Sequence, residues 1–196
     1  MQKRRRNCRL TILANASCNT GMSTINAPPL NSPLAIYLSA EAFIEATVKL
    51  EDQLRNLPSV TQIYATDAAH TAPTITLDSF SLELYMKCLY AIDHGKPMKG
   101  HNCKAIFSAL KPGTRDSLRY HYNIQLATDP TVGLVNKMQP GFSPTLDNCL
   151  DLCSNLFEKY RYLYEGIGQA KMFYWPLLRL AVRETVLAIN PAWRAQ

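Results

Sequence analysis

The pair of residues that most directly suggests chemistry in this sequence is Arg115 and His121, six positions apart in the run RDSLRYH. Histidine serves as a general acid or base on a ribose hydroxyl, and arginine stabilises negative charge developing on a phosphate. Six residues of helix span about 9 Å along the axis, which two long side chains can bridge to meet at one phosphate. The pair therefore predicts phosphate chemistry on RNA without a metal. An exposed polar helix face explains the same residues without any reaction.

A second group of candidates comprises Glu83 and Lys87, together with His101 further along the chain. Glu83 and Lys87 interrupt an almost wholly apolar stretch, and an acid four residues before a lysine is the favourable order for a helical ion pair. The pair indicates either a polar strip on a core helix or a polar cleft facing another helix. His101 begins the next apolar run, where it can turn back toward the pair or remain a loop or capping residue.

Arg161 completes this second group, in the aromatic run FEKYRYLYEG. An arginine between tyrosines packs its stem on the rings while its guanidinium reaches a carboxylate or a phosphate. A plain helical ion pair with Glu165 is the alternative. We predict that Glu83, Lys87, His101 and Arg161 form one polar cluster, which either binds a ligand or is structural.

Several common catalytic motifs are missing from the sequence. It has no Gly-x-x-x-x-Gly-Lys-Ser/Thr loop, no Gly-x-Gly-x-x-Gly after a strand, no His-Glu-x-x-His and no Gly-x-Ser-x-Gly. These absences argue against ordinary nucleotide hydrolases, dehydrogenases, metalloproteases and esterases, and we expect neither a cofactor nor a metal. None of the six cysteines has the Cys-x-x-Cys spacing, which favours buried apolar thiols in a reducing compartment.

The net charge of +6 is concentrated at the start of the chain. The first nine residues supply +5, whereas residues 10–196 carry 16 basic and 15 acidic side chains, so any site for a polyanion must be local. We expect residues 1–31 to be a disordered basic tail, and Met22 is an alternative start that would remove the basic cluster. The apolar run LTILA is too short for a secretory signal, and no stretch could span a bilayer. We therefore expect a cytoplasmic protein.

Helices must position these residues. Apolar side chains recur at helical spacing and two-residue alternation is scarce, which predicts an all-α fold, a bundle of five or six helices in one domain over residues 32–196. The first helix starts at Ser32-Pro33 or at Ser39 and stops at Pro58, and residues 59–73 are expected to be a linker. The further helices are expected at 74–92, at 101–110, after a cap at Thr114, at 145–164 after Ser143-Pro144, and at 172–188.

The segment SFSLELYMKCLYAIDHGKPMKGHNCKAIFSAL resembles the HEPN superfamily of small helical bundles. Glu83-Leu84-Tyr85-Met86-Lys87 is similar to the Glu-Leu-x-x-Lys helix of that family. Gly100-His101 leads into an apolar helix, where many members have Gly-His-Asp-Leu. The run FEKYRYLYE is similar to the Arg-Tyr-containing later helix of one bacterial subgroup. Together these parts span residues 79–165.

The resemblance implies a helical domain that dimerises and binds or acts on RNA or nucleotides, in many members within toxin–antitoxin or phage-defence systems. Active members are metal-independent endoribonucleases in which an arginine precedes a histidine by four to six residues. Here that spacing makes Arg115 the phosphate stabiliser and His121 the acid/base, while no histidine follows Arg161. The expected partners are a second copy, RNA or a nucleotide, and an antitoxin or other protein. The alternative is a catalytically inactive binding module with a structural polar cluster.

Overall fold

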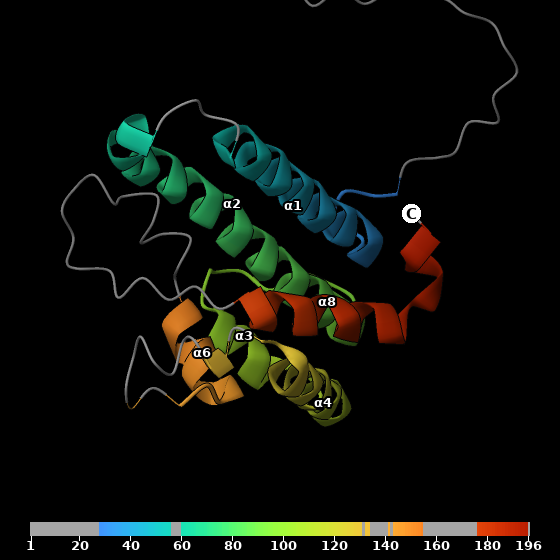
Figure 1. Ribbon diagram of the computed structural model, residues 1–196. Helices are drawn as coiled ribbons and strands as arrows, with labels where there is room; N and C mark the ends of the chain where they lie inside the picture. Colours follow the sequence, from blue (N-terminus) through green and yellow to red (C-terminus); the bar gives the residue numbers. More distant parts are fainter. Residues whose placement is uncertain are drawn as a thin grey trace, which may run out of the picture.

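The predicted all-α bundle is confirmed by the computed structural model. It describes residues 28–55, 60–130, 132–133, 141, 143–154 and 176–195, with the backbone alone at 54–55 and 60–72. Helix is the only regular secondary structure in these residues (Figure 1). The elements are α1 (Pro33–Arg55), α2 (Val60–His94), α3 (Cys103–Ala109), α4 (Pro112–Thr128), α6 (Leu146–Cys153), α8 (Pro176–Ile189) and the 3-10 helix η2 (Pro191–Ala195).

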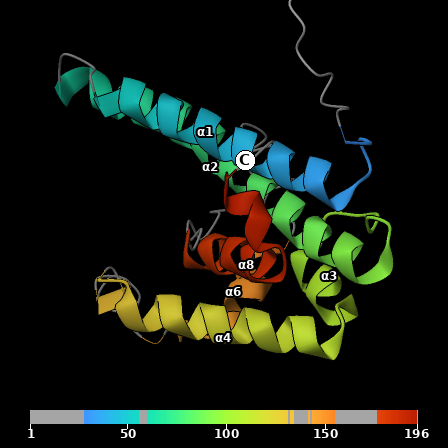
Figure 2. The same ribbon diagram turned by 90° about the vertical axis from the view of Figure 1, so that its right-hand side faces the viewer.

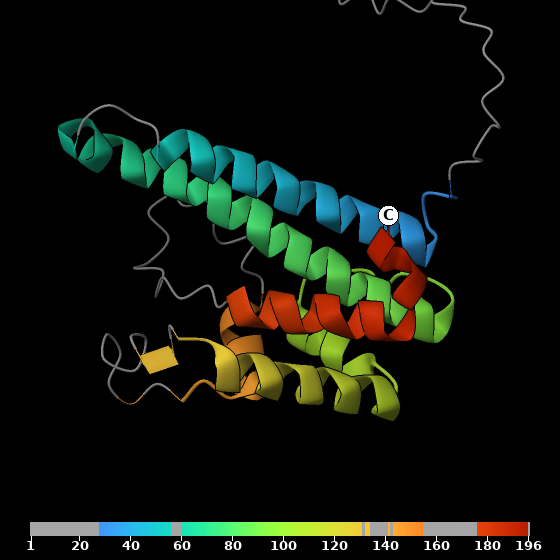
Figure 3. The ribbon, with the colours of Figure 1, turned by 45° about the vertical axis from the view of Figure 1, so that its right-hand side comes forward.

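The helices are stacked in layers. α1 and α2 form an antiparallel pair, α8 packs against α2, and α4 packs against the other side of α8 (Figure 2). The short helices α3 and α6 contact each other at the side of this stack. The α1–α2 pair extends beyond the other helices at the end where α1 stops and α2 begins (Figure 3).

The second half of α2 forms the centre of the core. A helix that is apolar around most of its circumference is expected to be buried, and each fully buried leucine contributes about 1.5–3 kcal/mol. α4 and α8 complete the core with their own buried faces. The largest fully buried side chains include Leu82, Tyr85, Met86 and Leu89 of α2, Leu118 and Tyr122 of α4, and Leu177, Leu178 and Leu187 of α8.

The predicted linker at 59–73 is wrong, because α2 begins at Val60 and includes Pro73. Proline has no backbone N–H, so the helix loses one hydrogen bond there, and this local signal favoured a break. Most helical stability in proteins comes from packing rather than from intrinsic propensity. α1 runs antiparallel beside α2 and gives it a packing partner (Figure 3).

The predicted cap at Thr114 is also wrong. α4 begins at Pro112 with Lys111 as its N-cap, since proline is favoured at the first helical position. Thr114 instead donates its hydroxyl to Asp93 Oδ1 at 2.7 Å, and the backbone N–H of Lys111 donates to Asp93 Oδ2 at 2.8 Å. A carboxylate at the end of α2 therefore caps α4 and joins the two helices.

The helix expected from 145 to 164 is shorter in its described part. Its N-cap is Thr145 rather than Ser143-Pro144, and Thr145 Oγ1 accepts a hydrogen bond from Asn148 N at 3.2 Å. α6 ends at Cys153, where Ser154 has an extended conformation and its Oγ lies 2.8 Å from Leu150 O. Such a side-chain bond competes with continuation of the helix. Residues 155–164 lie outside the described residues.

Other predicted boundaries are confirmed. Ser32 Oγ accepts from Ala35 N at 3.2 Å at the start of α1, and Gly95, with φ of 74°, follows the end of α2. α8 corresponds to the described part of the helix expected at 172–188. The expected tail lies outside the described residues up to position 27. In the described part of the chain, no helix has both the length and the apolar content needed to cross a membrane.

Candidate functional site

Glu83 lies in the buried half of α2, with its side chain only 2% exposed. Lys87, one helical turn later, donates from Nζ to Glu83 Oε1 at 2.7 Å. His101 Nδ1 lies 3.0 Å from both carboxylate oxygens of Glu83. The structure therefore brings together three of the four residues expected to form a polar cluster. The fourth, Arg161, lies outside the described residues.

The turn between α2 and α3 places His101 against a residue eighteen positions earlier. Gly95 and Gly100 have φ of 74° and 94°, a left-handed conformation that favours glycine. Asn102 then caps α3 by accepting a hydrogen bond from Ala105 N at 2.8 Å. The ring of His101 lies between this turn and α2, so the turn sets the position of His101 relative to Glu83.

The carboxylate at the centre of this cluster is enclosed and paired, whereas the side chain of His101 is 41% exposed. A carboxylate with so little exposure is costly to bury unless its oxygens are paired, and Glu83 receives hydrogen bonds from a lysine and a histidine. Burial, followed by the negative charge of Glu83, raises the pKa of the nearby Cys103 thiol to about 12. A thiol that stays protonated at neutral pH is a poor nucleophile.

The prediction of buried apolar thiols is confirmed for the cysteines that the structure describes. These cysteines are free and buried, and they are Cys88, Cys103, Cys149 and Cys153. Burial also raises the pKa of Cys88 to about 12. In the same described residues, no group of three His, Cys, Asp or Glu side chains is arranged to hold a metal ion.

Arg115 and His121 lie together on α4 but flank its buried face on opposite sides. At about 100° per residue, six residues place the two side chains about 120° apart around the helix axis. The buried positions Thr114, Leu118 and Tyr122 run between them. No hydrogen bond joins Arg115 to His121 within the described residues, so their joint action on one phosphate stays a prediction.

The immediate surroundings of Arg115 and His121 also differ. The Nε atom of Arg115 is buried and has no hydrogen-bond partner among the described residues. His121 is partly buried, and its ring contacts that of Tyr120 edge-on, with centroids 5.3 Å apart. Of these two side chains, that of Arg115 is the one with a buried nitrogen that lacks a hydrogen-bond acceptor among the described residues.

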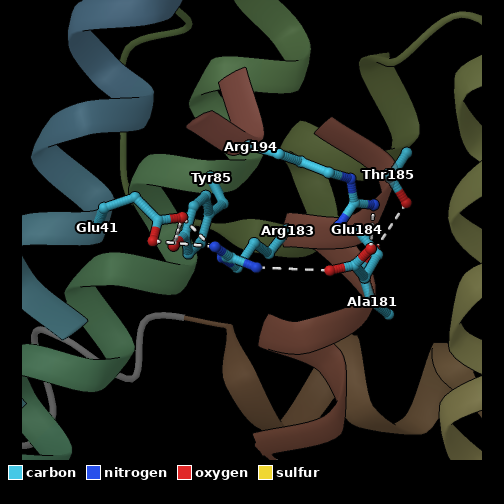
Figure 4. Close-up of polar contacts among 7 residues, drawn as sticks. All are labelled: Glu41, Tyr85, Ala181, Arg183, Glu184, Thr185 and Arg194. Carbon is cyan, nitrogen blue, oxygen red and sulfur yellow. Dashed lines mark hydrogen bonds and ion pairs between the residues drawn. The ribbon is translucent and has the colours of Figure 1, made fainter. Parts of the chain in front are cut away.

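A larger polar network joins α1, α2, α8 and η2 (Figure 4). Glu41 Oε1 accepts from Arg183 Nε and from the Tyr85 hydroxyl, both at 2.7 Å, and Glu41 Oε2 accepts from Arg183 Nη2 at 3.2 Å. Arg183 also approaches Glu184 at 3.4 Å, and Arg194 donates to Glu184 at 2.6 Å. This fork of arginine donors on one carboxylate is the stronger kind of ion pair.

The network changes the pKa values of its members, which favours an ionised Glu41 and protonated tyrosines. Burial opposes ionisation of Glu41, but hydrogen bonds from Arg183, Tyr85 and Tyr37 outweigh it and hold the pKa of the carboxyl below its usual range. Burial and the carboxylate raise the pKa of the Tyr37 hydroxyl to about 12 and raise that of Tyr85 as well. The donors of the network are paired and its tyrosines stay protonated. The network therefore connects helices and does not act as an acid–base centre.

Sequence reasoning missed this network, although one signal pointed to it. Arg179 and Arg183 interrupt the apolar run LLRLAVRETVLAI at a spacing of four, as Glu83 and Lys87 do in α2. Both arginines meet carboxylates of other helices: Arg179 Nε lies 2.7 Å from Asp78 Oδ1, and Arg183 binds Glu41, 142 positions away. No local spacing could identify partners so distant in sequence.

Positive charge is concentrated in one segment of the sequence. Residues 94–121, from the end of α2 to the middle of α4, contain six Lys and Arg against one Asp, a net charge of +5, with three of the four histidines. The remaining residues beyond the first nine, 10–93 and 122–196, contain ten basic and fourteen acidic side chains. We use the term basic end for Lys96, Lys99, Lys111, Arg115 and Arg119.

The two Glu–Lys pairs of the described helices allow a matched test of the buried cluster. Glu83→Gln leaves Lys87 mostly buried without its counter-ion, and we expect it to lower the free energy of unfolding by about 3–5 kcal/mol. Glu45→Gln breaks the Glu45–Lys49 pair, which has the same spacing but whose side chains are about 70% exposed. Urea unfolding measures both. Equal shifts in the two variants would contradict the structural role of Glu83.

The Glu41–Arg183 pair predicts a pH-dependent contribution to stability. The pKa of Glu41 is lower in the folded protein than its ordinary value of 4.5, so its stabilisation is fully present above that value and is lost as the pH falls through the folded pKa. Glu41→Gln should therefore be less stable than the wild type at pH 7, and the difference should shrink in acid. Urea unfolding of both proteins, from pH 7 down to pH values below 4.5, measures the difference in stability. A constant difference would contradict the ion-pair assignment.

Comparison with known proteins does not extend this description. No family model, no curated protein and no solved structure matches the chain. The likeness to the HEPN superfamily therefore stays a prediction that rests on the motif residues themselves. Of these, Glu83, Lys87 and His101 form a compact cluster in the structure.

Proposed function

We propose that this chain is a HEPN-like helical domain that binds RNA or a nucleotide at its basic end. One observation carries the proposal: residues 94–121 hold a net charge of +5, whereas the rest of the chain beyond its first nine residues is net negative. Nucleic-acid affinity depends strongly on local cationic side chains that neutralise phosphates. The nearly neutral total beyond the tail had concealed this separation of charge.

The ion pairing of the lysines supports the same proposal. Lys96, Lys99 and Lys111 are exposed, and none of them makes an ion pair with another described residue. Lys104, by contrast, is paired with Asp151 at 2.5 Å. Exposed lysines without counter-ions are available to phosphates, while the paired Glu83 cluster is not. The proposal accordingly assigns Glu83, Lys87 and His101 a structural role.

A metal-independent endoribonuclease is the second candidate function, and the unpartnered Nε of Arg115 favours it. In this reaction the ribose 2′-oxygen attacks the adjacent phosphorus, and the bond from phosphorus to the 5′-oxygen breaks. His121 would accept the 2′-hydroxyl proton, Arg115 would stabilise the charge on the phosphate, and water would protonate the leaving oxygen. The products would be a 2′,3′-cyclic phosphate and a 5′-hydroxyl.

The proposal also includes the homodimer and the antitoxin-like protein partner that the resemblance implies, together with the cytoplasmic location expected from the sequence. Support for a contact between copies comes from α4, where Tyr120 and Ile124 lie one turn apart. Their exposed fractions are 64% and 40%, which is high for large apolar side chains. A dimer that buried this face would cover part of α4.

Direct binding tests the main function. We expect the purified protein to raise the fluorescence anisotropy of a labelled single-stranded RNA, with an affinity that falls as NaCl increases. Neutralising about three phosphates of a single strand gives a slope near −2 in log K against log [NaCl]. A peptide nucleic acid of the same sequence, which lacks phosphates, is the control. Absence of binding to RNA and, by calorimetry, to ATP would reject the function.

Cleavage tests the second candidate separately. If His121 is the acid/base, His121→Ala should slow RNA cleavage about 100-fold or more, and EDTA should have no effect. Asn123→Ala alters an exposed residue of the same helix and should cleave at the wild-type rate. Capillary electrophoresis of a labelled RNA measures the rates. Unchanged cleavage in His121→Ala, or no cleavage by the wild type, would reject the endoribonuclease and leave RNA binding standing.

A further inference from the structure

α4 carries a row of positive side chains that does not include His121. Lys111, the N-cap residue before α4, is followed at intervals of four residues by Arg115 and Arg119, and the side chains of Arg115 and Arg119 are about 40° apart around the helix axis and about 6 Å apart along it. The backbone N–H of Arg115 donates to Lys111 O at 3.0 Å, which places Lys111 in register with the helix. We call these three residues the α4 stripe.

The position of the α4 stripe is electrostatically unfavourable in the protein alone. Like charges at this spacing repel one another, and cations are disfavoured near the positive N-terminal end of a helix. The first turn of α4 contains no acidic residue. Asp93 caps the helix from α2, and Asp116 lies 3.5 Å from Arg119, but neither carboxylate forms an ion pair with Arg115. A bound anion would relieve this repulsion.

Arg115 supplies an independent indication of a ligand. Its Nε is buried and lacks an acceptor among the described residues, although buried polar groups in folded proteins are nearly always hydrogen-bonded. Arg119, one turn later, is exposed and its guanidinium lies over the ring of Phe107, 5.2 Å from the centroid. The two guanidinium groups thus occupy the same flank of α4, and both retain donors for a phosphate.

The turn after α2 lies beside the start of the α4 stripe. Asp93 accepts from the backbone N–H of Lys111 at 2.8 Å, and His94 Nε2 lies 3.0 Å from Ala109 O. These contacts hold the end of α2 against the α3–α4 junction, which Figure 2 shows at one end of the stack. Lys96 and Lys99 are in this turn, so they extend the positive surface beyond α4.

We propose that the phosphate chain of RNA lies on the α4 stripe, with Arg115 and Arg119 contacting neighbouring phosphates and with Lys96 and Lys99 extending the track. This inference rests on the proposed function and assigns its surface. It makes Arg119, rather than His121, the residue that acts with Arg115 in binding. His121 lies on the other flank of the helix.

The test compares variants with equal loss of charge. Arg115→Gln/Arg119→Gln removes two phosphate contacts, so the salt slope for binding of labelled single-stranded RNA should fall by about 1.4 and the affinity near 0.15 M salt by about tenfold. Lys49→Gln/Arg194→Gln removes the same charge from α1 and η2 and should bind more nearly like the wild type.

Stability separates a ligand-binding role from a structural one. Because the α4 stripe is repulsive, Arg115→Gln/Arg119→Gln should have a thermal midpoint equal to or above that of the wild type, whereas a structural arginine would lower it. Arg119→Gln alone, at an exposed position, gives a second variant if the double variant is unstable. RNA binding by the wild type with unchanged affinity in the stripe variants overturns this inference alone. Absence of any binding by the wild type overturns the proposed function with it.

Discussion

The burial of Glu83 constrains the architecture around it. A carboxylate enclosed by a helical core needs its partners within hydrogen-bond reach, so Lys87 must lie on the same face and His101 must return from the following turn. That return fixes the path from α2 to α3. Asp93 then joins the end of α2 to the start of α4. Two carboxylates of α2, Glu83 and Asp93, thus position the elements that carry the basic end.

A second set of charges, which are partly buried, organises the opposite side of α2. Glu41 and Asp78 form ion pairs with Arg183 and Arg179, two residues one turn apart on α8. These pairs connect the α1–α2 layer to α8, whose apolar face already packs into the core. Hydrophobic burial supplies most of the driving force, and the paired charges restrict how the layers can slide or rotate against each other. Both sets of charges are neutralised internally, which distinguishes them from the basic end.

The sequence predicted those features that depend on short spacing and failed on those that depend on distant packing. Glu83, Lys87 and His101 lie within nineteen residues, and both helical periodicity and the glycines between them are local signals. The partners of Arg183 lie on α1 and α2, beyond the reach of any periodicity. Pro73 misled the prediction because its local cost is visible in sequence whereas the compensating contact with α1 is not. The Arg115–His121 spacing matched a motif, but the spacing alone does not reveal the flank on which each residue lies.

The layered order of the helices separates the requirements of folding from those of recognition. Ion pairs and apolar contacts lock α1, α2 and α8, whereas the basic end occupies an outer helix and a turn. Substitutions among its exposed lysines alter no core contact, so selection can tune affinity or change the preferred polyanion without crossing a stability threshold. Charged residues of the inner layers cannot be substituted in this way, because the substitution would leave the ion-pair partner without a counter-ion. Related chains should therefore diverge fastest in the turn after α2 and on the outer face of α4.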